Sequence, residues 1–303
     1  MSLVTGDRRS STRAKGGLLV KVRHGAYVAP EDWPEREREA AHFIRMQAVD
    51  AAMRTRPVFS HRSAALVWGL PVIGISNRVD LVGFARQGGR TRRGIVWHND
   101  AIRDDEVVEV DGMLVTSLVR TMVDLARTRD FAAAVAAVDR GLRSEFRSDL
   151  LGQVDGVPRE QVIEAIERYP GRRGIRAARA VVAFADPRSD SAGESASRAN
   201  MHLAGFPAPG LQVALERYDG GRDIVDFDWP DSGHFGEFDG RGKYLREEFT
   251  DGRALEEILL AEKDREDRIR RHRPFGIRWG WDIGTNLLRL RAHLIAHGLH
   301  PTR

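Results

Sequence analysis

Hydrophobic residues recur along this chain with two different spacings, which predicts a mixture of short strands and helices. A β-hairpin is expected at residues 18–28, where two β-prone runs flank His24 and Gly25. An Asp111–Gly112 turn joins the last two of four further strands, predicted at residues 78–82, 94–97, 107–110 and 113–116. Apolar residues at helical spacing predict helices at residues 35–55, 61–68, 117–125, 131–142, 159–168 and 175–184.

The last third of the chain has a simpler predicted order. A helix at residues 191–204 precedes three strands, and a charged helix precedes a fourth. The strands are predicted at 211–217, 223–229, 234–239 and 276–281, and the later helices at 256–272 and 285–297. This order is that of one mixed sheet with helices packed against it. It is also the order of a nuclease core, although many other α/β domains share it.

The length of the chain and its changes in character predict more than one domain. The chain has 303 residues, and domains commonly hold about 100–200. We expect a basic disordered arm at residues 1–17, a mixed α/β region at 18–150, a helical connector at 151–187 and an α/β domain at 188–303. Residues 144–158 are less regular than their neighbours and read as a connection.

Composition excludes some classes of protein and leaves nucleic-acid binding open. The chain has no cysteine, so disulfides and thiolate metal sites are excluded. No apolar run approaches the roughly 20 residues that cross a bilayer, and the basic N-terminus lacks the apolar stretch of a secretory signal. We therefore expect a cytoplasmic protein without a membrane partner. The net charge is +4 and rests mainly on arginine, which suits phosphate contact but also abounds in GC-rich genomes.

Carboxylates at the ends of two neighbouring predicted strands are the strongest chemical signal. Asp226 and Asp228 are expected to share one face of their strand, as are Glu237 and Asp239. A turn at residues 230–233 would bring the four together. Like charges this close repel, and a hard dication such as Mg²⁺ or Mn²⁺ relieves the repulsion. The alternative is a surface hairpin with ordinary solvated acids.

A metal held there predicts a chemistry for the neighbouring residues. A dication bound by Asp226, Glu237 and Asp239 can activate water for phosphodiester cleavage. Lys243 follows the second strand and is the candidate for stabilising the developing charge. Glu194, in the preceding helix, is a supporting candidate. A glutamate near a helix start is more often a partner of the helix dipole, however, so Glu194 alone indicates little.

These residues resemble the very-short-patch-repair-like proteins of the PD-(D/E)XK superfamily over about residues 189–290. The similarity rests on Glu194, Asp226 before an aromatic residue, and Glu237-Phe238-Asp239-Gly240. The charged helix and the closing strand around Arg278 also match. The resemblance implies a restriction-endonuclease-like α/β domain with catalytic Asp226, Glu237, Lys243 and Glu194. One position departs from the family, because Asp239 stands where its motif has lysine.

The first half of the chain resembles the antitoxins of the AbiEi type. The similarity rests on the run Lys21–Val28, on His61-Arg62-Ser63-Ala64-Ala65 and on Arg120-Thr121 with Asp124. It implies a winged helix and a toxin partner, but the recognition helix expected before the wing is missing. His61 is expected to make a structural hydrogen bond. The candidates for contact with nucleic acid are Arg8, Arg9, Lys21, Arg23, Arg241, Arg268 and Arg271.

The sequence therefore leaves three hypotheses, of which the two DNA-associated ones come first. The first is a Mg²⁺-dependent endonuclease with Asp226 and Glu237 as metal ligands. The second is a non-enzymatic antitoxin or repressor in which the nuclease fold is only a scaffold. The third is a protein-interaction module, which predicts no salt-dependent binding to DNA.

Overall fold

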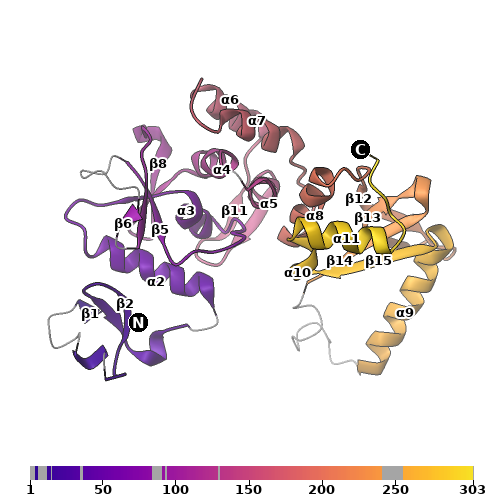
Figure 1. Ribbon diagram of the computed structural model, residues 1–303, viewed down its shortest axis with the longest axis horizontal. Coiled ribbons are helices and arrows are strands. Elements are labelled where there is room, and N and C mark those ends of the chain that lie inside the picture. The colour runs from indigo at the N-terminus through magenta and orange to yellow at the C-terminus, as the bar shows by residue number, and fades with distance from the viewer. Residues whose placement is uncertain are drawn as a thin grey trace. The chain divides into compact units, whose positions relative to one another are not determined.

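Two compact units make up the chain in the computed structural model (Figure 1). Unit 1 comprises Met1–Thr128 with Ser144–Val182, and unit 2 comprises Arg129–Arg143 with Ala183–Arg303. Both contain β-sheet flanked by helices, so the predicted mixed α/β class is confirmed. No described helix is long and apolar enough to cross a membrane. The structure describes residues 4–5, 12–14, 16–34, 37–83, 91–92, 94–128, 130–240 and 255–302.

A six-stranded mixed sheet forms the centre of unit 1. Its order is β6-β7-β5-β4-β9-β8. Phe59, Leu81 and Val115 lie on its three central strands and are fully buried, so the sheet is the core of the unit. The strands are β4 (Val58–Phe59), β5 (Val79–Val82), β6 (Thr91–Arg92), β7 (Ile95–His98), β8 (Val107–Val110) and β9 (Met113–Thr116).

The helices of unit 1 begin and end largely where the sequence indicates. Gly69 ends α3 with φ of 76°, and a side chain there would collide with the backbone of Ser148. Ser117 caps α4 by accepting a hydrogen bond from the Arg120 backbone amide. The helices are α2 (Arg38–Asp50), α3 (His61–Trp68), α4 (Leu118–Ala126), α6 (Arg159–Glu167) and α7 (Ile175–Phe184), of which the last continues into unit 2.

Two small β elements in unit 1 differ from the sequence-based expectation. The hairpin β10 (Glu145–Ser148) and β11 (Gly152–Asp155) occupies a segment expected to be an irregular connection. Within the supposedly disordered arm, β1 (Val4–Thr5) pairs with β3 (Ala26–Val28), and residues 12–14 are helical. The hairpin of β2 (Val20–Arg23) and β3 forms as predicted around Gly25. A short 3₁₀ helix, η1 (Pro30–Asp32), follows it.

Unit 2 contains one four-stranded sheet in the order β12-β13-β14-β15. β12 and β13 pair antiparallel, as do β13 and β14, whereas β14 and β15 pair in parallel. The strands are β12 (Gly210–Glu216), β13 (Arg222–Trp229), β14 (His234–Asp239) and β15 (Phe275–Gly280). The helices are α5 (Phe131–Gly141), α8 (Ala192–Leu203), α9 (Leu255–His272), α10 (Trp281–Gly284) and α11 (Leu287–Ala296), with η3 (Pro230–Ser232) between β13 and β14.

Helix α5 packs with unit 2 although the sequence places it in the middle region. Asp139 on α5 forms a buried ion pair with Arg198 on α8, at 2.8 Å between Oδ2 and Nη2. The Arg198 guanidinium also lies over the ring of Phe184. Unit 2 therefore combines Ala183–Arg303 with a helix from about fifty residues earlier in the chain, which periodicity alone could not assign.

The central strands of unit 2 change the face to which their side chains point. Leu211 and Phe227 belong to the apolar cluster that includes α8 and α11 residues, whereas Val213 and Val225 pack with Ile269 of α9. Residues two apart in a strand normally share a face. On β12 the reversal occurs at Gln212, which has a φ of 50°, where the β12–β13 register passes from Leu211–Phe227 directly to Val213–Val225. This irregularity determines where the acidic side chains point.

Candidate active site

Glu194 lies in the first turn of α8, where it completes the helix cap. The Ser191 hydroxyl accepts a hydrogen bond from the Glu194 backbone amide at 3.2 Å, and the Glu194 carboxylate accepts one from the Asp190 amide at 2.8 Å. The first contact satisfies an amide that the helix leaves without a partner, and the second fixes the residue before the N-cap. The structural role expected of a glutamate near a helix start is therefore present.

Gln212 connects Glu194 with Asp226. Its side-chain Nε2 donates to Glu194 Oε2 at 2.9 Å and to Asp226 Oδ1 at 3.3 Å. The other oxygen of Asp226 accepts a hydrogen bond from the Phe238 backbone amide at 2.8 Å. The pKa of Glu194 is raised, first by burial and then by the negative charge of Asp226. The two carboxylates thus form an interacting pair at the start of α8.

Glu237 is held by two arginines. Its Oε1 lies 2.5 Å from Arg265 Nη2, and its Oε2 lies 2.8 Å from Arg278 Nη2. Arg265 is on α9, and Arg278 pairs with Glu237 across the parallel strands β14 and β15. Both oxygens of this buried carboxylate are therefore engaged by cations. Such ion pairs satisfy a buried charge without a metal.

The expectation that Asp226 and Asp228 share a face is wrong. Asp228 is buried and makes a two-point ion pair with Arg273 at the end of α9, at 2.6 and 3.0 Å. Asp226 instead contacts Gln212 and the Phe238 amide. The face reversal at Gln212 explains the separation. Asp239 is half-buried, and its Oδ1 lies 4.0 Å from Arg278 Nη1.

The donor atoms fit a hard dication at the Glu194–Asp226 pair. Carboxylate oxygens are the ligands that Mg²⁺ prefers, and a dication would relieve the repulsion that raises the pKa of Glu194. Glu237 fits less well, because a metal would have to displace Arg265 or Arg278. In the part of the chain that the structure describes, no three histidine or acidic side chains converge as a metal site. Lys243 lies outside the described residues.

Two proteins of Mycobacterium tuberculosis are similar to most of this chain. They are "Uncharacterized protein MT2308" of strain CDC 1551 / Oshkosh and "Uncharacterized protein Rv2248" of strain ATCC 25618 / H37Rv. Each is 31% identical over 231 residues, which cover 72% of this chain and 73% of the relative. The chain belongs to the family of these proteins. No family model matches it, and no solved structure matches it.

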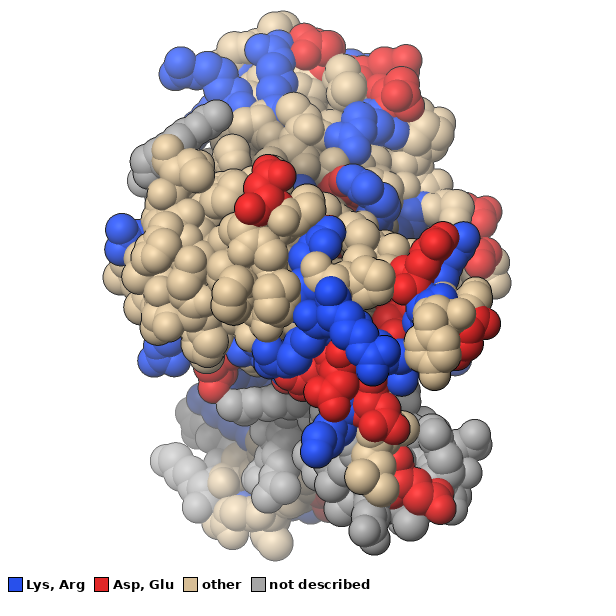
Figure 2. All heavy atoms as spheres, turned by 90° about the vertical axis from the view of Figure 1, so that its right-hand side faces the viewer, with Lys and Arg blue, Asp and Glu red and all other residues tan. Residues whose placement is uncertain are grey.

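The basic residues predicted to contact nucleic acid differ in how far their side chains already bind other groups of the protein. Arg268 pairs with Asp223 at 2.8 Å, and Arg23 donates to the Ala48 carbonyl oxygen at 3.2 Å. Lys21 and Arg271 are exposed. On the face of unit 2 in Figure 2, positive and negative side chains adjoin one another. Arg8, Arg9 and Arg241 lie outside the described residues.

The sequence patterns did not indicate three residues that contact the acidic side chains, namely Gln212, Arg265 and Arg278. Gln212 is an isolated amide in a strand and carries no local signal. Arg265 belongs to a helix rich in both charges, which is usually a solvated face. Arg278 was noticed only as part of the closing strand. Their contacts with Glu194 and Glu237 join segments 18 to 41 residues apart, so a local pattern could not reveal them.

A second polar cluster lies in unit 1 of this family member and was also missed. Arg120 is buried and donates to Asp124 at 2.9 Å and to Glu106 at 2.8 Å, and it also donates to the Tyr169 hydroxyl at 2.8 Å. Asp124 is buried too, and its Oδ2 lies 3.8 Å from the His61 Nδ1. These residues tie α4, the segment before β8 and the end of α6 together. The motif Arg120-Thr121-x-x-Asp124 is therefore part of the framework of the unit.

Proposed function

We propose that this protein acts on or at nucleic acid, with unit 2 as a restriction-endonuclease-like module. The order α8-β12-β13-β14-α9-β15, with β15 parallel to β14, is the helix–strand order that the sequence resemblance implies. The observation that carries the proposal is the pairing of Glu194 with Asp226 beside the Phe238 amide. These residues come from the helix and the two strands on which that resemblance expects them.

In this proposal, Glu194 and Asp226 hold a magnesium or manganese ion. The bound ion would supply a Lewis acid and a water of lowered pKa for phosphodiester hydrolysis. Gln212 orients both carboxylates, because its Nε2 donates to each. Arg265 and Arg278 hold the carboxylate of Glu237 in ion pairs, and Lys243 is the basic partner of the proposed reaction.

A second candidate is a non-enzymatic antitoxin or repressor of the AbiEi type. It is favoured by the capture of Glu237 by Arg265 and Arg278, together with the acid at position 239, where the superfamily motif has lysine. Such a protein would use the nuclease fold as a scaffold, bind DNA without a dication and partner a cognate toxin. A cytoplasmic location is part of both candidates.

A cleavage assay separates the two candidates. Supercoiled plasmid and single-stranded DNA are incubated with wild type, Asp226→Asn and Glu237→Gln, in Mg²⁺, Mn²⁺ or EDTA. Asp219→Asn is the matched control, because Asp219 is an exposed acid in the same unit that pairs with Arg217 on a turn. An endonuclease predicts cleavage by wild type and the control, and loss of cleavage in Asp226→Asn and in EDTA.

Equal cleavage by all four proteins would indicate a contaminating nuclease and would contradict the proposal that this protein is an endonuclease. Full DNA binding in EDTA without cleavage would favour the repressor. Binding is followed by fluorescence anisotropy at several salt concentrations, since phosphate contacts give a steep salt dependence. Absence of salt-dependent binding to any nucleic acid would contradict both candidates and leave a protein-interaction module.

A further inference from the structure

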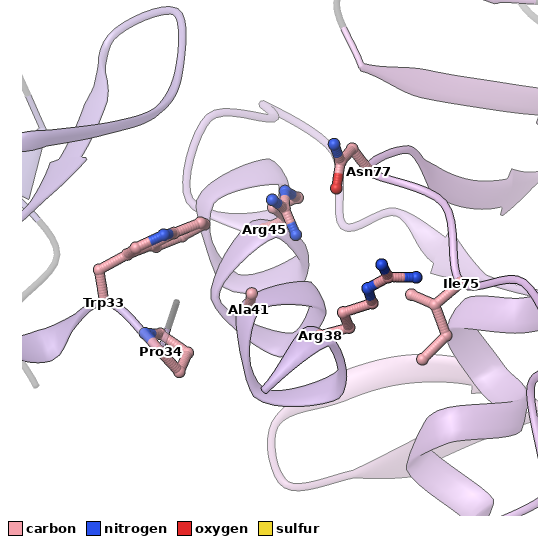
Figure 3. A pocket seen from close by; sticks show the side chains of 7 residues that line it. All are labelled: Trp33, Pro34, Arg38, Ala41, Arg45, Ile75 and Asn77. Carbon is pink, nitrogen blue, oxygen red and sulfur yellow. The ribbon is translucent and has the colours of Figure 1, made fainter. Parts of the chain in front are cut away.

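A polar pocket of about 450 Å³ lies beside α2 in unit 1. Figure 3 shows Arg38 and Arg45 on the helix, with Trp33 on one side and Ile75 and Asn77 on the other. The volume lies within the range of small-ligand pockets, roughly 300–1,000 Å³. No acidic side chain is among the described residues that line it. Two cations and an aromatic ring therefore border the pocket without a carboxylate.

Arg45 is the residue that most needs an explanation. It is half-buried, and burial lowers the pKa of its guanidinium. Among the described residues, no ion pair or hydrogen bond engages that group. Other partly or fully buried arginines, such as Arg120 and Arg198, have carboxylate partners. A desolvated guanidinium without an acid favours binding of an anion from solution.

Trp33 adds an aromatic surface to the same pocket. The Arg45 guanidinium lies over its ring, with Cζ 5.0 Å from the ring centroid. The attraction between a cation and the face of an aromatic ring holds the guanidinium plane in place. It leaves the donors of Arg45 for a ligand. Arg38 and Asn77 are exposed at the same pocket and offer further donors.

We propose that this pocket binds a nucleotide unit, with its phosphate on Arg45 and Arg38 and its base against Trp33. Phosphate suits arginine because two N–H groups match two oxygens. A base suits the Trp33 and Arg45 surface because aromatic rings and guanidinium planes both stack on bases. Every lining residue belongs to unit 1, so the inference does not depend on the proposed function of unit 2.

Isothermal titration of the full chain with AMP, a short single-stranded oligonucleotide and inorganic phosphate tests the inference. The variants are Arg45→Gln and Trp33→Leu. Arg62→Gln is the matched control, since Arg62 is an exposed arginine of unit 1 outside the pocket. We expect Arg45→Gln to weaken AMP or oligonucleotide binding at least tenfold. Trp33→Leu should weaken both of these ligands, and Arg62→Gln should change neither.

Comparing the two nucleotide ligands shows whether the pocket takes a free nucleotide, which AMP represents, or a nucleotide within a strand, which the oligonucleotide represents. Inorganic phosphate binding as tightly as AMP would overturn the role of Trp33. No binding of AMP or oligonucleotide by wild type would overturn the site. Unfolding midpoints of all variants exclude a folding defect. Asp226→Asn should bind AMP as wild type does, which separates this site from the site in unit 2.

Discussion

The imidazole of His61 lies flat against that of His98, with ring centroids 3.4 Å apart and an interplanar angle of 14°. His98 Nε2 also lies 2.7 Å from Asp80 Oδ1. The pKa of His61 is held well below its ordinary value, first by burial and then by His98, although Asp80 opposes the shift. Two charged imidazoles this close would repel each other.

Acid should therefore destabilise unit 1 through His61. The unfolded chain takes up a proton at His61 near pH 6.5, whereas the folded protein does so only at lower pH. Between these values the unfolded state binds more protons, so the free energy of unfolding falls as pH falls. One such group contributes up to about 1.4 kcal/mol per pH unit. The free energy is measured by urea unfolding from pH 7.5 to pH 5.

His61→Asn is the informative variant for this effect. His61 has a φ of 49°, which asparagine tolerates better than most residues. The variant should lose less stability than wild type between pH 7.5 and pH 5. Because the raised pKa values of acids that do not contact His61, such as Asp139, act in both proteins, the difference between the two curves reports the His61 site. Parallel curves would contradict a neutral, buried His61.

The ion pair between Asp139 and Arg198 should be among the most sensitive contacts in unit 2. Both side chains are buried, and Asp139 also accepts a hydrogen bond from the Asp186 amide. Asp139→Ala would leave the Arg198 charge buried without its partner, and such changes cost about 3–5 kcal/mol. Urea unfolding gives the free energy, and hydrogen exchange of the α5 and α8 amides localises the loss.

An exposed ion pair supplies the comparison. Glu167 and Arg179 are exposed and lie 2.8 Å apart, so Glu167→Ala should leave the unfolding midpoint nearly unchanged. If Asp139→Ala were as mild as Glu167→Ala, the buried pair would not be what attaches α5 to α8.

The close packing of Gly193 against Phe238 gives a third prediction. A Cβ at position 193 would overlap the Phe238 ring. Alanine improves helix propensity over glycine by up to about 1 kcal/mol, whereas overpacking a core costs about 1–3 kcal/mol. Gly193→Ala should therefore lower the melting temperature. Gly240→Ala is the control, because no described residue lies within 4 Å of its added Cβ, and its melting temperature should stay the same.

Local sequence patterns predicted where helices and strands begin and end better than they predicted which residues come into contact. The helix at residues 61–68 and the strands at 107–110 and 113–116 have the predicted bounds; Gly69 ends the helix, and the Asp111–Gly112 turn separates the two strands. The β10–β11 hairpin was missed, since its strands are short and carry mainly polar residues. The reversal at Gln212 was missed because alternation was assumed to continue, and it separates Asp226 from Asp228.

The last prediction concerns the Glu194–Asp226 pair and can be tested without an activity assay. The charge of Asp226 helps to raise the pKa of Glu194, after burial. Asp226→Asn removes that charge but keeps an oxygen for the Phe238 amide, so the pKa of Glu194 should fall toward its ordinary value. Carbon-13 NMR titration of the Glu194 carboxyl measures the shift, with Asp219→Asn as the control. An unchanged Glu194 pKa in Asp226→Asn would mean that the two carboxylates do not interact, and a dication shared by them would then have no physical basis.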